Sequence, residues 1–187
     1  MAKSSTNSSP YATQLEGCTI RARVAFVLAV AEWARDKVIT SKDASARLHN
    51  AFDLAWRWQQ TANVSGKTLD SVLADEADTG LAVEESMAPT AEKPAWVTIT
   101  SAICYVCWHA YINVGDEEGM SEFISEVRED VIDQTIDFAR RVPGFNQAAV
   151  DRLAQYCINH HKMANDKELG EPISRETMMQ VADWARA

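Results

Sequence analysis

Apolar side chains recur along most of the chain at the spacing of an α-helix, and almost no stretch alternates as a β-strand does. Ser41, Ser65 and Ser174 precede such stretches and are good N-cap residues. The predicted helices cover residues 13–37, 41–62, a segment that begins at Ser65, and residues 95–114, 121–142, 146–164 and 174–184; residues 75–94 are a predicted loop. This pattern predicts an all-α bundle of about six to seven helices.

The helix predicted over residues 95–114 contains the densest run of chemically capable side chains, AICYVCWHAY at 102–111. Successive helical residues turn by 100°, so its apolar residues, including Cys104, Cys107 and Trp108, fall on one arc of roughly 200°. An arc this wide predicts a central helix that several neighbours pack against. The opposite side of this helix is predicted to be polar and holds Thr98, Ser101, Tyr105, His109 and Asn113.

The cysteines and histidines leave a choice between a metal site and buried thiols. A tetrahedral zinc set of three cysteines and one histidine would use Cys104, Cys107, Cys157 and His161. A zinc half-site, however, normally places its Cys-x-x-Cys pair on a tight turn, whereas Cys104 and Cys107 lie in the middle of a helix. Free cysteine is among the most buried residue types. The sequence therefore favours structural thiols and no cofactor, with zinc as the weaker alternative.

Length and composition are those of one globular unit. The chain has 187 residues, of which 47% are hydrophobic, and its six tryptophans supply much of the expected core. Residues 1–12 are polar and rich in serine and threonine, which is typical of a flexible tail. We expect a single α-helical domain over residues 13–187.

The charge of the chain is strongly acidic, with a formal net charge of −9. This balance argues against a nucleic-acid-binding protein, which needs clustered lysine and arginine to contact phosphates. The acid is concentrated in residues 75–92 and 116–137. These acid-rich segments have two interpretations. They are either solvated helical faces or an acidic docking surface for a basic protein. Its candidate residues are Asp75, Glu76, Asp78, Glu84, Glu85, Asp116, Glu117 and Glu118.

Two features of the sequence predict the cellular location of the protein. RARVAFVLAVAEWA has the look of a signal peptide, but it begins more than twenty residues into the chain and continues into a helical pattern. No stretch approaches the ~20 apolar residues that span a bilayer. We therefore expect a cytoplasmic protein without a membrane partner, in which the cysteines stay reduced.

Residues 51–81 and 95–111 resemble the sixth numbered family of predicted immunity proteins from bacterial polymorphic toxin systems. The resemblance rests on Trp56, Trp58, Ser65, Gly66, Leu69, Asp75, Gly80, Trp96, Tyr105, Trp108, Ala110 and Tyr111. It implies a mostly helical protein that binds a cognate toxin and inhibits it stoichiometrically. It transfers no catalytic residues.

Two function classes follow. The first is a non-catalytic immunity protein whose acidic face binds a basic toxin, such as a nuclease, with Tyr105 or Trp58 as an apolar anchor at the rim. The second is a small all-α enzyme that uses carboxylates or the Cys/His set, with or without a metal. The chain has no glycine-rich phosphate loop, G-x-S-x-G or H-E-x-x-H motif. The first class is therefore preferred.

Overall fold

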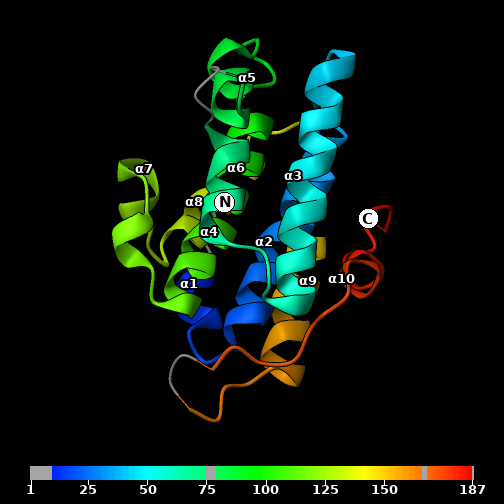
Figure 1. Cartoon of the computed structure of the whole chain (residues 1–187). Helices are drawn as coiled ribbons and strands as arrows, with labels where there is room; N and C mark the ends of the chain where they lie inside the picture. Colours follow the sequence, from blue (N-terminus) through cyan, green and yellow to red (C-terminus); the bar gives the residue numbers. More distant parts are fainter. Residues whose placement is uncertain (1–9, 75–78, 166–167, 187) are drawn as a thin grey trace.

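The computed structural model describes residues 10–74, 79–165 and 168–186. These residues form α-helices and one short 3₁₀ helix, with no β-strand among them (Figure 1), so the predicted all-α class is confirmed. The elements are α1 (Tyr11–Leu15), α2 (Ile20–Arg35), α3 (Lys42–Thr61), α4 (Gly66–Leu73), α5 (Leu81–Met87), α6 (Lys93–Val114), η1 (Glu117–Gly119), α7 (Glu122–Ser125), α8 (Val131–Ala139), α9 (Gln147–His160) and α10 (Arg175–Ala182). Of the predicted tail, residues 1–9 lie outside the described residues.

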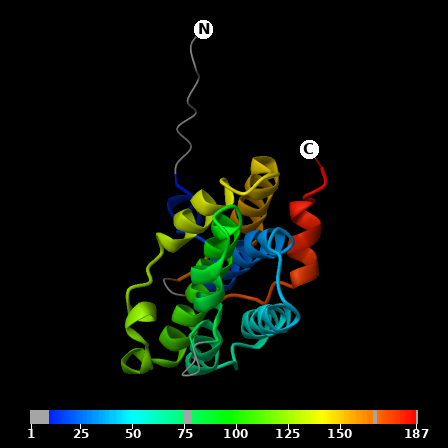
Figure 2. The same cartoon turned by 90° about the horizontal axis from the view of Figure 1, so that it is seen from above.

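Two helices, α2 and α6, occupy the middle of the molecule, with the others around them (Figure 2). Helix α2 is buried at every residue from Ile20 to Ala34. Helix α6 is, among the described residues, long and apolar enough to cross a membrane by length and composition alone, but 78% of that window is buried in the fold. A core helix passes the same test. The central position predicted for α6 is confirmed, and α2 shares it.

The polar side predicted for α6 is wrong for three of its five residues, whereas Asn113 is exposed and Ser101 is half-buried. Thr98, Tyr105 and His109 are all buried, with exposed fractions of 0%, 0% and 3%. The Thr98 hydroxyl donates to the carbonyl of Pro94 at 2.8 Å, and the Tyr105 hydroxyl donates to Glu129 at 2.6 Å. Hydrogen bonding makes burial of Thr98 and Tyr105 tolerable, whereas the ring nitrogens of His109 have no hydrogen-bond partner among the described residues.

The charged side chains of α2 are tied to distant elements. The Arg23 guanidinium lies 2.8 Å from the Glu129 carboxylate. Glu32, whose side chain is only 5% exposed, accepts from the indole of Trp56 at 3.0 Å and from Arg175 at 2.8 Å. A buried charge is costly unless it is paired and hydrogen-bonded. These contacts therefore fix α3, α10 and the segment before α8 against α2.

The predicted helix start sites are confirmed. The side chains of Ser41, Ser65 and Ser174 each accept a hydrogen bond from the backbone N–H three residues later. Such a cap satisfies one of the four N–H groups that a helix leaves unpaired at its first turn. These boundaries depend on local chemistry.

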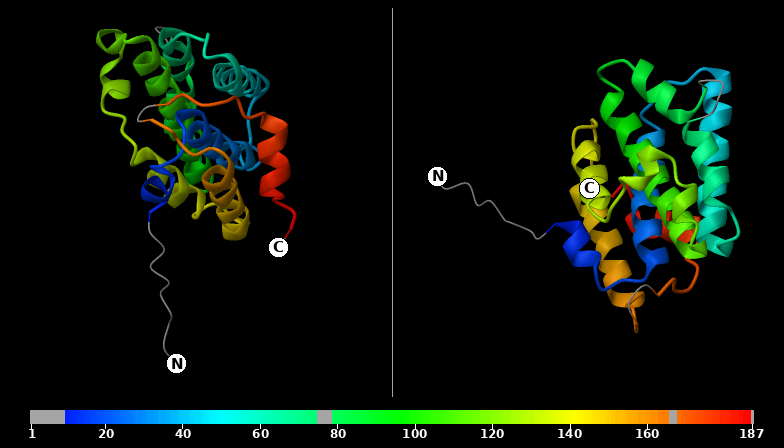
Figure 3. Two further views of the ribbon diagram at one scale, coloured as in Figure 1. Left: turned by 90° about the horizontal axis from the view of Figure 1, so that it is seen from below. Right: turned by 60° about the vertical axis from the view of Figure 1, so that its left-hand side comes forward.

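The single helix predicted over residues 13–37 is divided into α1 and α2. The break occurs because the backbone between α1 and α2 pairs with the segment that follows α9. The Thr19 N–H donates to the carbonyl of His161, and the Met163 N–H donates to the carbonyl of Gly17, both at 2.9 Å. The carbonyls of Glu168 and Leu169 then accept from the first N–H groups of α2. Figure 3, left, shows this segment crossing the start of α2 on its way to α10.

Two further boundaries differ from the prediction. The helix predicted over 121–142 is divided into α7 and α8, because the Arg128 guanidinium donates to the carbonyls of Ser125 and Val127 at the end of α7. The predicted loop over 75–94 contains α5. Leu81 at the start of α5 is fully buried, and a Cβ on Gly80 would lie 2.2 Å from the Leu73 carbonyl oxygen. The close approach of α4 and α5 thus requires glycine there.

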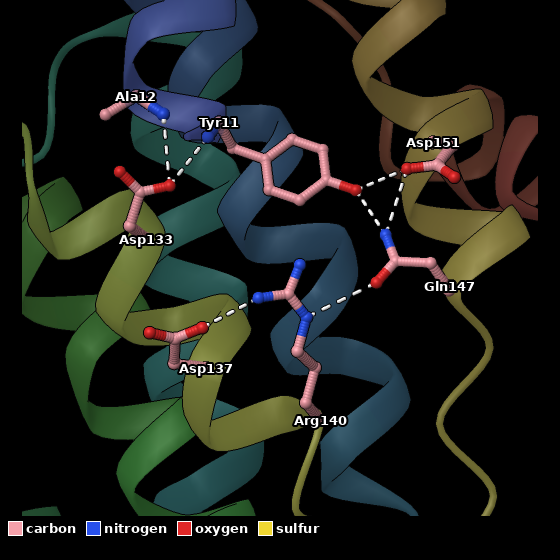
Figure 4. Close-up of polar contacts among 7 residues, drawn as sticks. All are labelled: Tyr11, Ala12, Asp133, Asp137, Arg140, Gln147 and Asp151. Carbon is pink, nitrogen blue, oxygen red and sulfur yellow. Dashed lines mark hydrogen bonds and ion pairs between the residues drawn. The ribbon is translucent and has the colours of Figure 1, made fainter. Parts of the chain in front are cut away.

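Helix α1 is fastened to α8 and α9 by the polar contacts drawn in Figure 4. Asp133 accepts from the backbone N–H groups of Tyr11 and Ala12, at 2.6 and 3.3 Å. The Tyr11 hydroxyl donates to Asp151 and accepts from Gln147. A carboxylate of α8 thereby caps the start of α1, which has no side-chain cap of its own.

We expect Asp133→Ala to lower the free energy of unfolding by about 1 kcal/mol, because it removes the only such cap among the described contacts of α1. Asp137→Ala is the matched control on α8: its ion pair with Arg140 is exposed, so its loss should cost less than about 0.5 kcal/mol. Urea unfolding of both variants measures the difference. Equal effects would contradict the capping role.

Candidate functional site

A groove of about 380 Å³ lies between α6, α7 and α8. Buried side chains form its floor, among them Cys104 of α6, Val127 and Val131. Phe123 of α7 lies at its edge with 58% of the residue exposed. The groove therefore combines an apolar floor with an exposed aromatic ring.

Three carboxylates line the same groove: Glu85 from α5, and Glu126 and Asp130 from the connection between α7 and α8. Glu85 accepts from the Thr100 hydroxyl, and Asp130 accepts from Gln134 at 3.3 Å. Within the described residues none of the three forms an ion pair, because the nearby Arg128 donates to backbone carbonyls instead. Arg128 also lines the groove, so three carboxylates and one guanidinium surround it and the balance is negative.

Helix α7 carries Phe123 and forms one wall of the groove, and this wall is held at both ends. Before α7, the backbone N–H and the hydroxyl of Ser121 donate to Asp70 at 3.3 and 3.1 Å. After α7, Glu129 accepts from Tyr105 and pairs with Arg23. Burial, followed by the charge of Glu129, raises the pKa of Tyr105 well above its ordinary value, so its hydroxyl stays protonated as a donor. These contacts fix where Phe123 lies.

His109 lies behind this wall, with its Nε2 3.8 Å from Glu129. Burial, and then the positive charge of Arg23, lowers the pKa of His109 to about 3. At neutral pH the ring is uncharged, so its approach to Glu129 is not an ion pair. His109 instead packs among the aromatic rings of Trp58, Tyr105 and Trp108.

A second hollow, of about 770 Å³, lies beside α4 and η1. Asp70, Tyr111 and Asp116 line it, together with Lys67. Burial and the charge of Asp70 raise the pKa of Tyr111 to about 12. Asp70 already accepts hydrogen bonds from Ser121, so its carboxylate stabilises the fold.

The predicted docking residues are distributed over several places. Asp75, Glu76 and Asp78 lie outside the described residues. Glu84 pairs with Arg47, Glu85 lines the groove, and Asp116 lines the second hollow. Glu117 and Glu118 are exposed on η1.

The predicted aromatic anchors are wrong. Trp58 and Tyr105 are both completely buried. The exposed aromatic residue at the groove is Phe123, for which the sequence made no prediction. The acid run at 116–137 did indicate Glu126 and Asp130 as members of an acidic surface, but no local signal marked the groove.

The predicted alternative zinc set is not assembled. Cys104, Cys107, Cys157 and the fourth cysteine, Cys18, are free and buried. The thiols of Cys107 and Cys157 lie against the carbonyls of Gly66 and Ala22, on different elements. Across the residues described, no three histidine, cysteine, aspartate or glutamate side chains are placed to hold a metal ion.

The cysteine thiols are also poor nucleophiles. Burial raises the pKa of Cys104, Cys107 and Cys157 far above the ordinary value. The thiolate is the reactive form of cysteine, so at neutral pH these side chains are protonated. Cys104, which reaches the groove, therefore acts there as a small apolar group, and the groove is suited to binding.

Comparison with known proteins gives one family. A family model described as "Immunity protein Imm6" matches residues 22–142, which run from α2 through α8 and include the groove. Neither the curated proteins nor the solved structures contain a match.

We expect the double change Cys104→Ala and Cys107→Ala to leave a folded protein. Each change opens a small cavity, which should cost about 1 kcal/mol of unfolding free energy. Circular dichroism and urea unfolding check this result, and metal analysis of the unaltered protein is its companion. Stoichiometric zinc that the double change releases would contradict structural thiols.

The stability of the protein should fall with acid through His109. Its pKa is about 3 when folded and 6.5 ordinarily, so between these values the unfolded chain binds a proton that the folded protein does not. The contribution of His109 to the free energy of unfolding is fully present above pH 6.5. Between pH 6.5 and about 3 it falls by up to about 1.4 kcal/mol per pH unit. Urea unfolding at several pH values should show a shallower fall for His109→Leu and an unchanged one for exposed His49→Leu. Equal slopes in all three proteins would refute this assignment.

Proposed function

The chain belongs to the Imm6 family of immunity proteins, which are broadly inhibitors of toxins, and we propose that it binds one cognate toxin directly and neutralises it in a stoichiometric complex. The observation that carries the proposal is the groove of α6, α7 and α8, which joins an apolar floor to carboxylates that form no ion pair within the described residues. Surfaces of this kind bind proteins through an apolar centre and a charged rim.

The charge of the chain supports a basic toxin as the partner. A net charge of −9 produces a negative field that attracts a cationic protein and speeds its association. A nuclease is one such toxin, because its cleft binds phosphates. The same charge disfavours nucleic acid as a direct partner of this chain.

The buried thiols support a protein without chemistry of its own that acts in the cytoplasm. Protonated, enclosed cysteines suit a reducing compartment. There the protein would meet the toxin inside the producing cell, before the toxin is exported. Inhibition then needs only a stable complex that blocks the toxin.

The exposed acid beyond the groove would contribute to the approach of the toxin. Glu117 and Glu118 on η1 are exposed and form no ion pair within the described residues. Charges of this kind at a rim change the association rate more than the dissociation rate. Glu84, already paired with Arg47, would contribute less.

The direct test uses the cognate toxin, to be sought first in the gene next to the one that encodes this chain. Co-expression should restore growth to cells that make the toxin, and the two purified proteins should form a complex of fixed stoichiometry in calorimetry. Activity of the toxin should fall to zero at the equivalence point. Growth without protection, and no complex at micromolar concentrations, would refute the proposal.

Charge reversal tests the contribution of η1. The pair Glu117→Lys and Glu118→Lys should slow association several-fold at low salt and leave dissociation nearly unchanged. Glu176→Lys on α10 is the control, because α10 lies on the side of the molecule opposite η1 and α7 (Figure 1). Association rates that are unaffected by the pair and by salt would remove η1 from the binding surface.

A further inference from the structure

We infer that the groove between α6, α7 and α8 is the docking site for one short segment of the toxin, in which an apolar side chain is flanked by lysine or arginine. This inference rests on the proposed function and assigns the part of the surface that carries it. The occupant is defined by the two kinds of side chain that line the groove.

The apolar part of the segment is matched by the floor and by Phe123. Cys104, Val127 and Val131 leave apolar surface at the bottom of the groove, and Phe123 stands beside it with 58% of its surface exposed. Large aromatic residues next to a hollow are the usual source of binding energy in protein interfaces. An inserted leucine, methionine or aromatic side chain would cover both the floor and the ring.

The basic part of the segment is matched by the rim. Glu126 and Asp130 are exposed, and Glu85 is half-buried beside them. Arg128 lines the groove as well, and its guanidinium donates to the carbonyls of Ser125 and Val127. Its charge is therefore held by backbone dipoles, and the carboxylates remain available to cations of the partner.

The groove is already formed in the free protein. Ser121 is bound to Asp70 before α7, Ile124 of α7 is fully buried, and Glu129 is bound to Arg23 after α7. An interface that is held in place before binding does not lose the free energy of ordering a loop. Phe123 and Glu126, on the exposed side of α7, are thus presented on a fixed support.

The test compares four variants with unaltered protein, using the purified cognate toxin in a catalytically inactive form. Phe123→Ala and Glu126→Lys change the groove. Ile39→Ala removes another exposed apolar side chain, in the turn between α2 and α3, and Glu176→Lys reverses a charge on α10. All four residues are exposed, so the variants should fold, which circular dichroism verifies.

We expect Phe123→Ala and Glu126→Lys each to weaken binding about tenfold or more, with most of the Phe123 effect in the dissociation rate. Ile39→Ala and Glu176→Lys should bind within about twofold of the unaltered protein. Added salt should weaken the unaltered complex more than the Glu126→Lys complex.

Three results would overturn the inference, and they are distinguishable. If the unaltered protein binds and inhibits the toxin but Phe123→Ala and Glu126→Lys bind equally well, the groove is not the docking site while the proposed function stands. If the unaltered protein does not bind the toxin, the proposed function fails as well. If sedimentation shows a dimer that Phe123→Ala dissociates, the occupant is a second copy of this chain.

Discussion

Burial of α2 together with its charged side chains is the constraint on which the rest of the structure depends. A helix that is enclosed on all sides cannot leave its charges unpaired, because removing them from water costs several kcal/mol each. Arg23 is therefore paired with Glu129, and Glu32 with Trp56 and Arg175. These contacts hold α3 and α10 against one helix and place the segment before α8, where Glu129 also accepts from Tyr105 of α6.

The same constraint shapes the surface. Because Glu129 pairs with Arg23 and accepts from Tyr105, the connection between α7 and α8 is fixed to the core. Its neighbours Glu126 and Asp130 then face the groove. A partly buried ion pair thus supports an exterior charge pattern. The acidic run is divided between residues that stabilise the fold and residues that line the groove.

The side chains suited to recognition lie at the surface, and the side chains that could perform chemistry lie in the interior. The groove brings together apolar side chains, an exposed ring and carboxylates, while the thiols and His109 lie buried and uncharged at neutral pH. The family match makes the chain an immunity protein, broadly an inhibitor of a toxin. The family match spans α2 to α8, which contains both the central ion pair and the groove.

The sequence by itself determined the helical class, the start sites at Ser41, Ser65 and Ser174, the central position of α6 and the acidic character of the surface. These features depend on the periodicity of apolar residues, on caps a few residues long and on composition, all of which are local. Only the tertiary structure decided that α6 is buried on its polar side, that Thr19 breaks the first helix by pairing with His161, and that Phe123 is exposed. Each of these depends on a partner far away in the chain, such as Glu129 for Tyr105, 24 residues on. A helical pattern states which residues share a face, but the neighbouring elements decide which faces are covered.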